Sequence, residues 1–135
     1  MENALQEPKV ICLQDNKFEQ EIVPGVALIK HTFGNHLSVA LFKIVKGQGS
    51  RFPKQLHKHG EEIGIQLKGS SRVFACGKEY VINEGEVIII PADCENAGIF
   101  GDEECLLLAI ATPPRNDYGT SDWSSVGEPQ LVIQR

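Results

Sequence analysis

Short apolar runs alternate along the chain with turns rich in glycine, proline and asparagine. No window repeats its apolar residues with the period of a helix, and several runs are rich in the β-branched residues that favour strands. The expected strands cover residues 26–31, 36–45, 72–76, 79–82, 87–90, 97–100 and 105–112, and a further strand begins near Glu62. So many short strands predict an all-β, antiparallel sandwich or barrel.

The first two central strands are expected to form a hairpin around Gly34-Asn35, a pair that readily supplies the positive backbone angles of a tight turn. His31 and His36 flank this turn symmetrically and are expected to face each other across it. With no third ligand nearby in the sequence, we expect both imidazoles to be solvated and assign them no role.

Two further apolar runs, residues 10–13 and 131–133, lie outside the central strands, and residues 14–21 are expected to form a charged loop. At 135 residues the chain is long enough for one domain with its own core. We expect a single domain over 1–135 with its core over 25–115. An N-terminal strand and the C-terminal tail then pack outside the barrel or across a dimer.

The formal net charge of −5, without any long basic run, argues against a nucleic-acid partner. The N-terminus lacks a basic start followed by an apolar stretch, and no segment is apolar enough to span a membrane. We therefore expect a soluble, cytoplasmic protein with no membrane partner.

The cysteines form no CxxC pair, and no histidine lies close to any of them in the sequence. Three of the four lie in or beside apolar, strand-like runs, where a thiol behaves as a small apolar side chain. We expect buried, free thiols at Cys12, Cys76, Cys94 and Cys105.

Histidines and carboxylates crowd together in one stretch, residues 49–69. Gly49 is followed by five residues, then by Gln55 and, two positions later, His57; four residues on comes Glu62, and six further residues lead to Gly69. Imidazoles and carboxylates at the start of a strand are suited to binding a metal ion or moving a proton.

A second spaced pattern begins at Gly85, with five residues before Pro91, Asp93 two positions later, then two residues, Asn96, three residues and Phe100. Together the two patterns resemble the paired motifs of the cupins, which are small jelly-roll barrels. In the cupin motifs a histidine stands where this chain has Gln55, another where it has Asn96, and an asparagine where it has Phe100. The resemblance spans residues 36–115 and implies a single-domain, antiparallel jelly-roll barrel of the cupin type.

The resemblance implies a metal site in the barrel, in either of two registers. In one, the ligands are Gln55, His57, Glu62 and Asn96; in the other, His57 and His59 are the histidine pair and act with Glu62. Two imidazoles and a carboxylate suffice for iron(II) or manganese, and nickel or zinc are further candidates. Amide oxygens bring no charge, so the first register would hold a divalent ion more weakly.

An alternative without metal is equally open. Strand alternation places Gly64 and Gln66 on the same face as Glu62. Within a polar barrel lumen, His57, Glu62 and Gln66 would then hydrogen-bond one another and an organic ligand. We therefore name Gln66 as a candidate substrate-binding residue.

Residues 57–64 and 112–118 resemble segments of the small cupins associated with breakdown of unsaturated uronic acids. The resemblance implies that Arg115, after the Pro-Pro step, binds a sugar carboxylate. The acidic residue that these cupins carry six positions before the arginine falls on Ala109 in this chain.

Two functions follow as hypotheses. One is a metal-dependent enzyme acting on a small carboxylated or sugar-like metabolite, and the other is a metal-free binding or sensing module with the same ligand. In either case the apolar runs at 10–13 and 131–133 are suitable for edge pairing. We therefore expect a homodimer.

Overall fold

The computed structural model describes residues 5–14, 20–23, 26–44, 60–94, 96–100 and 104–116, and within these only the backbone of 21–23, 44 and 97–100. The described residues contain strands and no helix, so none could cross a membrane as a helix. The strands are β1 (Gln20–Val23), β2 (Val26–Phe33), β3 (Ser38–Ile44), β4 (Glu61–Lys68), β5 (Ser71–Ala75), β6 (Lys78–Ile82), β7 (Val87–Ile90), β8 (Asn96–Phe100) and β9 (Cys105–Thr112).

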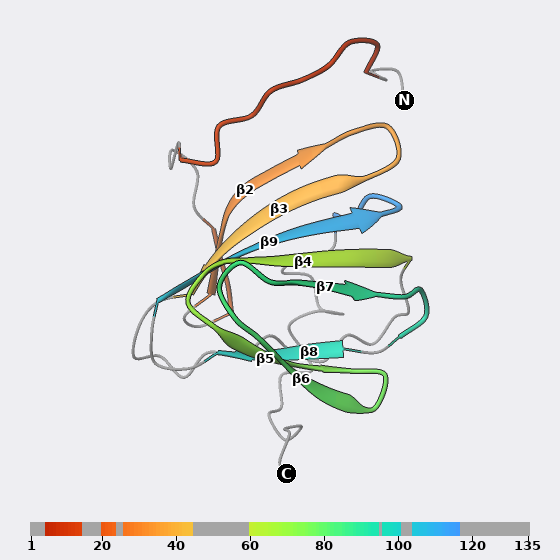
Figure 1. The fold of residues 1–135 in the computed structure, drawn as a ribbon. Coiled ribbons are helices and arrows are strands. Elements are labelled where there is room, and N and C mark those ends of the chain that lie inside the picture. Colours follow the sequence, from red (N-terminus) through yellow and green to blue (C-terminus); the bar gives the residue numbers. More distant parts are fainter. Residues whose placement is uncertain are drawn as a thin grey trace.

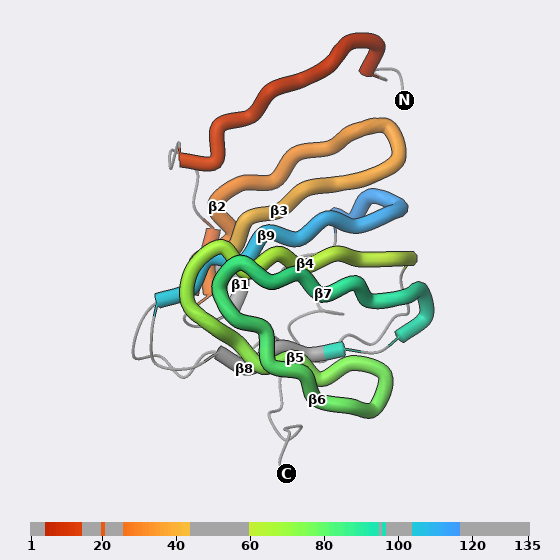
Figure 2. The backbone as a smooth tube through the Cα atoms, in the orientation of Figure 1, coloured from red at the N-terminus to blue at the C-terminus, as the bar shows by residue number. Residues whose placement is uncertain are grey.

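The strands form two antiparallel sheets, which confirms the predicted all-β fold (Figure 1). The larger sheet has the order β1-β2-β3-β9-β4-β7, and the smaller sheet has the order β6-β5-β8. The chain passes from the larger sheet to the smaller one between β4 and β5 and between β7 and β8, and it returns between β6 and β7 and between β8 and β9. In the tube view the smaller sheet lies beside the β7 edge of the larger one (Figure 2).

Side chains on the two faces of the larger sheet pack into separate clusters, as the strand period of two requires. We call the face that carries Phe42 and Leu107 the inner face, and the face that carries Leu41 and Leu108 the outer face. The inner face of β7 packs against β5 through Ile90, so the inner face is turned toward the smaller sheet. The inner-face cluster is Val26, Leu28, Ala40, Phe42 and Cys105, with Leu107 and Ala109 packed against it.

A β-bulge in β2 reverses the alternation of that strand. Leu28 pairs with Phe42 and Lys30 pairs with Leu41, so one extra residue, Ile29, is inserted between them. A bulge of this kind moves every later side chain to the opposite face. His31, which simple alternation from Leu28 would turn outward, therefore pairs with Ala40 on the inner face.

The β2–β3 turn differs from the expected tight hairpin. Phe33 pairs with Ser38 across a four-residue connection, and the amide of Gly34 donates to the carbonyl of Leu37 at 2.8 Å. Neither Gly34 nor Asn35 has a positive φ, so the predicted backbone angles were wrong. His31 and His36 do not face each other either.

The N-terminal apolar run also differs from expectation, because residues 10–13 form no strand. The segment is held instead by side chains: the Leu5 amide donates to Asn35 Oδ1 at 2.7 Å, and Lys9 Nζ donates to Thr32 Oγ1 at 2.8 Å. Leu13 packs on the outer-face cluster of Ile29 and its neighbours. The strand that precedes β2 is β1, in a region where the sequence indicated a charged loop.

The cysteines also differ from the expectation of four buried, free thiols. Cys76, in the β5–β6 turn, and Cys94, after β7, form a disulfide, and Cys12 is exposed. Only Cys105 is the expected buried free thiol, and its Sγ donates to the Ser70 carbonyl at 3.2 Å. The sequence offered no signal for the pairing, because the two cysteines lie 18 residues apart and meet only when β7 packs on β5.

We predict that removing the disulfide lowers the free energy of unfolding by about 3 kcal/mol, the chain-entropy effect of a loop of this length. Urea unfolding of a variant with Cys76→Ser and Cys94→Ala measures the loss, and dithiothreitol should reduce the stability of the wild type by a similar amount. Cys12→Ser is the control and should behave as the wild type. A wild-type stability that dithiothreitol leaves unchanged would contradict the prediction.

Candidate functional site

Polar side chains gather at one end of the inner face. The register places Ser38 of β3, Ala111 of β9, Glu62 of β4 and Ile90 of β7 in one row across the larger sheet. Neighbours in such a row share a face and lie close enough for their side chains to meet. Because Ile90 packs against the smaller sheet, Glu62 lies at the level where the two sheets approach each other.

Arg115 reaches this row from the segment that follows β9. Pro113 and Pro114 have no backbone N–H to continue the ladder, so β9 ends at Thr112 and the chain turns away. The backbone N–H of Arg115 donates to Ser38 Oγ at 2.9 Å, and His31 Nε2 donates to the Arg115 carbonyl at 2.9 Å. Both backbone polar groups of Arg115 are therefore held, one by β3 and the other by β2.

The Arg115 guanidinium forms an ion pair with Glu62, with 2.6 Å between Nη1 and Oε2. The side chain of Arg115 is 4% exposed and that of Glu62 is 13% exposed. A charge-assisted hydrogen bond this short is strong, and burial weakens the competition from water. Each charge compensates the other in surroundings where neither would be stable alone.

The chain enters β4 through a glycine that admits no side chain. A Cβ on Gly60 would lie 1.9 Å from the Thr112 carbonyl oxygen and 2.6 Å from Pro113 Cδ. Glycine thus allows the start of β4 to pack directly against the end of β9. The same contact brings Glu62 and Arg115, 53 residues apart in the sequence, to one place.

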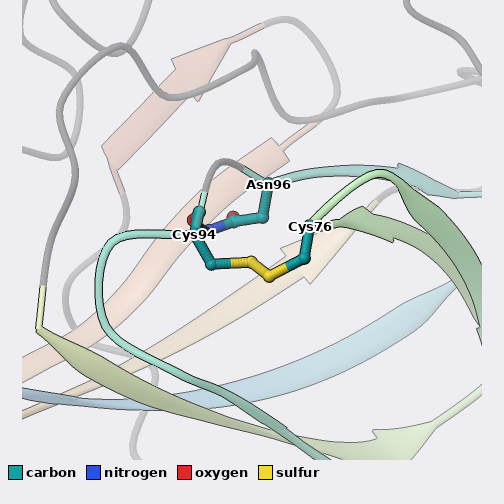
Figure 3. Close-up of a disulfide and its surroundings, with 3 residues drawn as sticks. All are labelled: Cys76, Cys94 and Asn96. Atoms are coloured by element: carbon teal, nitrogen blue, oxygen red, sulfur yellow. Dashed lines mark hydrogen bonds between the residues drawn. A yellow bond between two sulfur atoms is a disulfide. The ribbon is translucent and has the colours of Figure 1, made fainter.

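Asn96 lies on the inner side of the smaller sheet. It pairs with Ala75, which belongs to the cluster formed with Ile90 and Cys94. Its Nδ2 donates to the Cys94 carbonyl at 3.2 Å, beside the disulfide (Figure 3). Because Ile90 neighbours Glu62 in the larger sheet, Asn96 and Glu62 lie toward the same end of the barrel.

Gln66, a predicted substrate-binding residue, shares the inner face with Glu62, but its side-chain amide is hydrogen-bonded to other residues of the protein. Its Oε1 accepts from Ser71 Oγ and its Nε2 donates to the Lys68 carbonyl, both at 2.9 Å. Gln66 is 0% exposed, and both ends of its amide are hydrogen-bonded within the protein. These contacts show Gln66 closing the β4–β5 end of the barrel, and they give no support to a binding role.

His31 is the site residue that sequence reasoning missed. Its ring is half-buried, lies 4.7 Å from the ring of Phe33 and holds the Arg115 carbonyl, so the expectation of a solvated imidazole was wrong. The bulge at Ile29 is the cause, and no residue near it identifies a bulge from the sequence.

The predicted metal ligands are described only in part, since Gln55, His57 and His59 lie outside the described residues. Among those described, no three histidine, cysteine, aspartate or glutamate side chains cluster in a way that could hold an ion. Glu62 has its charge balanced by Arg115, and a guanidinium beside a carboxylate opposes a cation there. Of the predicted ligands the described residues therefore include only Glu62, which Arg115 engages, and Asn96.

A family model of the AraC-like ligand binding domain matches residues 40–129 of the chain. The comparison with curated proteins finds no matching sequence.

Solved structures with a similar fold include KdgF from Halomonas sp., with a TM-score of 0.67 and 18% identity over 82% of this chain and 98% of that one. An RmlC-like cupin from Shewanella frigidimarina has a TM-score of 0.66 and 16% identity over 84% of this chain and 99% of that one. For the cupin domain of Cnp3 from Schizosaccharomyces pombe the TM-score is 0.59 and the identity 17%, over 70% and 68% of the two chains. These likenesses confirm the predicted jelly-roll fold of the cupins.

We predict that Arg115→Ala lowers the free energy of unfolding by about 3–5 kcal/mol, because Glu62 is left as an uncompensated buried charge. The matched control is Arg72→Ala, which breaks the pair between Arg72 Nη1 and Glu79 Oε2 at 3.1 Å. Glu79 is 10% exposed, about as buried as Glu62, but Arg72 is 48% exposed, so water reaches the pair from the side of the arginine. Its loss should therefore cost about 1 kcal/mol or less.

Urea unfolding compares the two variants. Adding Glu62→Gln to Arg115→Ala should restore part of the stability, because the unpaired charge is removed with it. Equal losses for Arg115→Ala and Arg72→Ala would show that the pair with a buried arginine contributes no more than a pair whose arginine is exposed.

Proposed function

Because the chain belongs to the family of AraC-like ligand-binding domains, we propose that its barrel binds a small carboxylated or sugar-like metabolite beside Glu62 and Arg115. The observation that carries the proposal is the buried ion pair between these two residues, at the polar end of the inner face. A family model for ligand binding supports the general activity, and the site residues and ligand class are our proposal.

Arg115 is the group we assign to the ligand carboxylate. A guanidinium is planar and presents five N–H donors, so it can contact Glu62 and a second carboxylate at the same time. The contacts of its backbone with Ser38 and His31 hold the residue in place before any ligand arrives. Such preorganisation raises affinity because less freedom is lost on binding.

Glu62 is the group we assign to ligand hydroxyls. It is the more exposed partner of the pair, and an ionised carboxylate accepts hydrogen bonds without donating any. A sugar acid carries both a carboxylate for Arg115 and hydroxyls for Glu62. The resemblance of residues 57–64 and 112–118 to the uronate cupins supports the same ligand class.

The alanine at position 109 supports ligand binding rather than the reaction of the uronate cupins. It pairs with Ala40 on one side and Gly64 on the other, so this row of the inner face holds no second carboxylate. A single carboxylate, already paired with Arg115, is poorly suited to act as a general acid and base in turn. We therefore propose a binding or sensing module.

A metal-dependent enzyme is the second candidate, favoured by the position of Glu62 and Asn96 toward the same end of the barrel. His57, His59 and Glu62 would hold an iron, manganese, nickel or zinc ion, or Gln55 and Asn96 would complete the set in the other register. The ion would supply Lewis-acid polarisation of a ligand oxygen.

A cytoplasmic location, expected from the N-terminal sequence, remains a prediction. It is opposed by the disulfide between Cys76 and Cys94, because structural disulfides are rare in reducing compartments.

We predict that Arg115→Lys weakens binding of galacturonate or glucuronate by about tenfold or more, because lysine keeps the charge but loses the planar pair of donors. Isothermal titration measures the affinity, with the uncharged parent sugars as comparison ligands. Arg72→Lys, which alters the pair with Glu79 on the smaller sheet, should bind as the wild type does. Unchanged affinity in Arg115→Lys would remove the carboxylate role.

We predict that ligand-induced stabilisation persists in excess chelator. Thermal unfolding of untagged protein with each sugar acid, with and without EDTA, measures it. Loss of the stabilisation in EDTA, with recovery on adding one of the four metals, would support the metal-dependent enzyme instead.

A further inference from the structure

The disulfide joins two connections of the chain and no strand. Cys76 is the first residue of the two-residue turn between β5 and β6, and Cys94 lies between β7 and β8. Cys76 is exposed, whereas Cys94 is 8% exposed. A thiolate from solution can therefore approach the bond from the side of Cys76. Exposed disulfides are the ones most readily reduced and formed again.

The backbone beside both sulfurs is held in the left-handed region. Among the residues that the structure describes, the non-glycine residues with a positive φ are Cys76, at 50°, and Asp93, at 66°, which directly precedes Cys94. Cysteine is not among the residues that favour this region, and a two-residue turn with two positive φ angles usually begins with asparagine, aspartate or glycine. Such conformations persist where the surrounding structure enforces them. The disulfide is the covalent constraint that both segments share.

Asn96 connects the disulfide with the candidate site. Its Nδ2 donates to the Cys94 carbonyl at 3.2 Å, and Figure 3 shows its side chain pointing toward Cys94, next to the disulfide. Asn96 is half-buried on the inner side of the smaller sheet, at the end of the barrel where Glu62 and Arg115 form their ion pair. A change in the position of Cys94 therefore reaches this end of the barrel through Asn96.

We propose that Cys76 and Cys94 form a redox switch for the binding site. The disulfide holds Cys94 and Asn96 in the arrangement that binds ligand, and reduction releases them, so that Cys76 and Asp93 return to ordinary backbone angles. The inference takes its ligand from the proposed function and rests on it to that extent.

The reducing step uses a dithiol or glutathione as the reductant. Its thiolate attacks the sulfur of Cys76, and Cys94 leaves as a thiolate, which takes up a proton. A second thiolate of the reductant attacks the sulfur of its own half of the mixed disulfide, and Cys76 leaves and is protonated. The protein gains two electrons and two protons, and the reductant becomes a disulfide.

A reversible bond also agrees with the cytoplasmic location that the sequence predicts. Disulfides in reducing compartments are usually transient and serve catalysis or redox sensing. The bond between Cys76 and Cys94 opposes that location only if it is permanent.

The first test compares the two forms of the folded protein. Thiol titration after unfolding identifies them, because the disulfide form has free thiols only at Cys12 and Cys105, and the reduced form has four. Nitrogen-15 relaxation should show lower order parameters for residues 92–94 and 96 in the reduced form, and unchanged ones for β2 and β3. Unchanged order parameters at all of these positions would overturn the proposal.

The second test measures affinity in both forms. Isothermal titration with galacturonate and glucuronate should show about tenfold weaker binding to the reduced form. By reciprocity, saturating ligand should shift the balance between thiol and disulfide in glutathione buffers toward the disulfide by the same factor.

Two variants control for other effects of the reductant. A variant with Cys76→Ser and Cys94→Ala should bind as the reduced form does, with or without dithiothreitol. Cys12→Ser, which alters the exposed free cysteine, should keep the full response. Circular dichroism checks that each variant folds.

The outcomes separate the switch from the proposed function. Equal affinity of the two forms, or a bond that no glutathione buffer reduces, would overturn the switch. If neither form binds a sugar acid, the proposed function fails. The relaxation data then decide the switch by themselves, because redox-dependent order at residues 92–94 and 96 supports it and equal order overturns it.

Discussion

The ion pair between Glu62 and Arg115 joins an interior strand to the segment that follows β9, at a depth where neither charge is well hydrated. The attraction between two buried opposite charges offsets their desolvation cost only while they stay in contact. If they separate, the full cost of desolvation remains. The surrounding structure maintains that geometry through Ser38 and His31, which hold the backbone of Arg115. The site is thus part of what stabilises the barrel.

The sequence predicted most of the strands correctly. It did not predict where they begin and end, or which of their side chains turn inward. Glycine turns and β-branched runs located β2 through β9, since local pattern and local propensity agree there. β1 was missed because its residues are too polar to stand out, and the apolar run at 10–13 was mistaken for a strand. That run packs on the sheet through Leu13, which is a tertiary contact that no local pattern encodes.

For the candidate site, the sequence suggested Glu62 and Arg115 separately, one as a metal ligand and the other as a residue that binds a carboxylate. It could not show that they bind each other, because the contact depends on the register of β4 against β9 and on the close approach at Gly60. His31 was lost for a similar reason, since one bulged residue reverses which side chains of β2 turn inward. The pairing of Cys76 with Cys94 likewise required the packing of one sheet on the other.

β4 carries two surfaces at once, and their separation depends on the strand's register. Glu62, Gly64 and Gln66 face inward, while Ile63 and Ile65 face outward. A slip of one residue would place the aliphatic side chains beside Arg115 and the carboxylate on the apolar face. The buried ion pair opposes that slip from the inside, because Glu62 cannot leave Arg115 without a large cost.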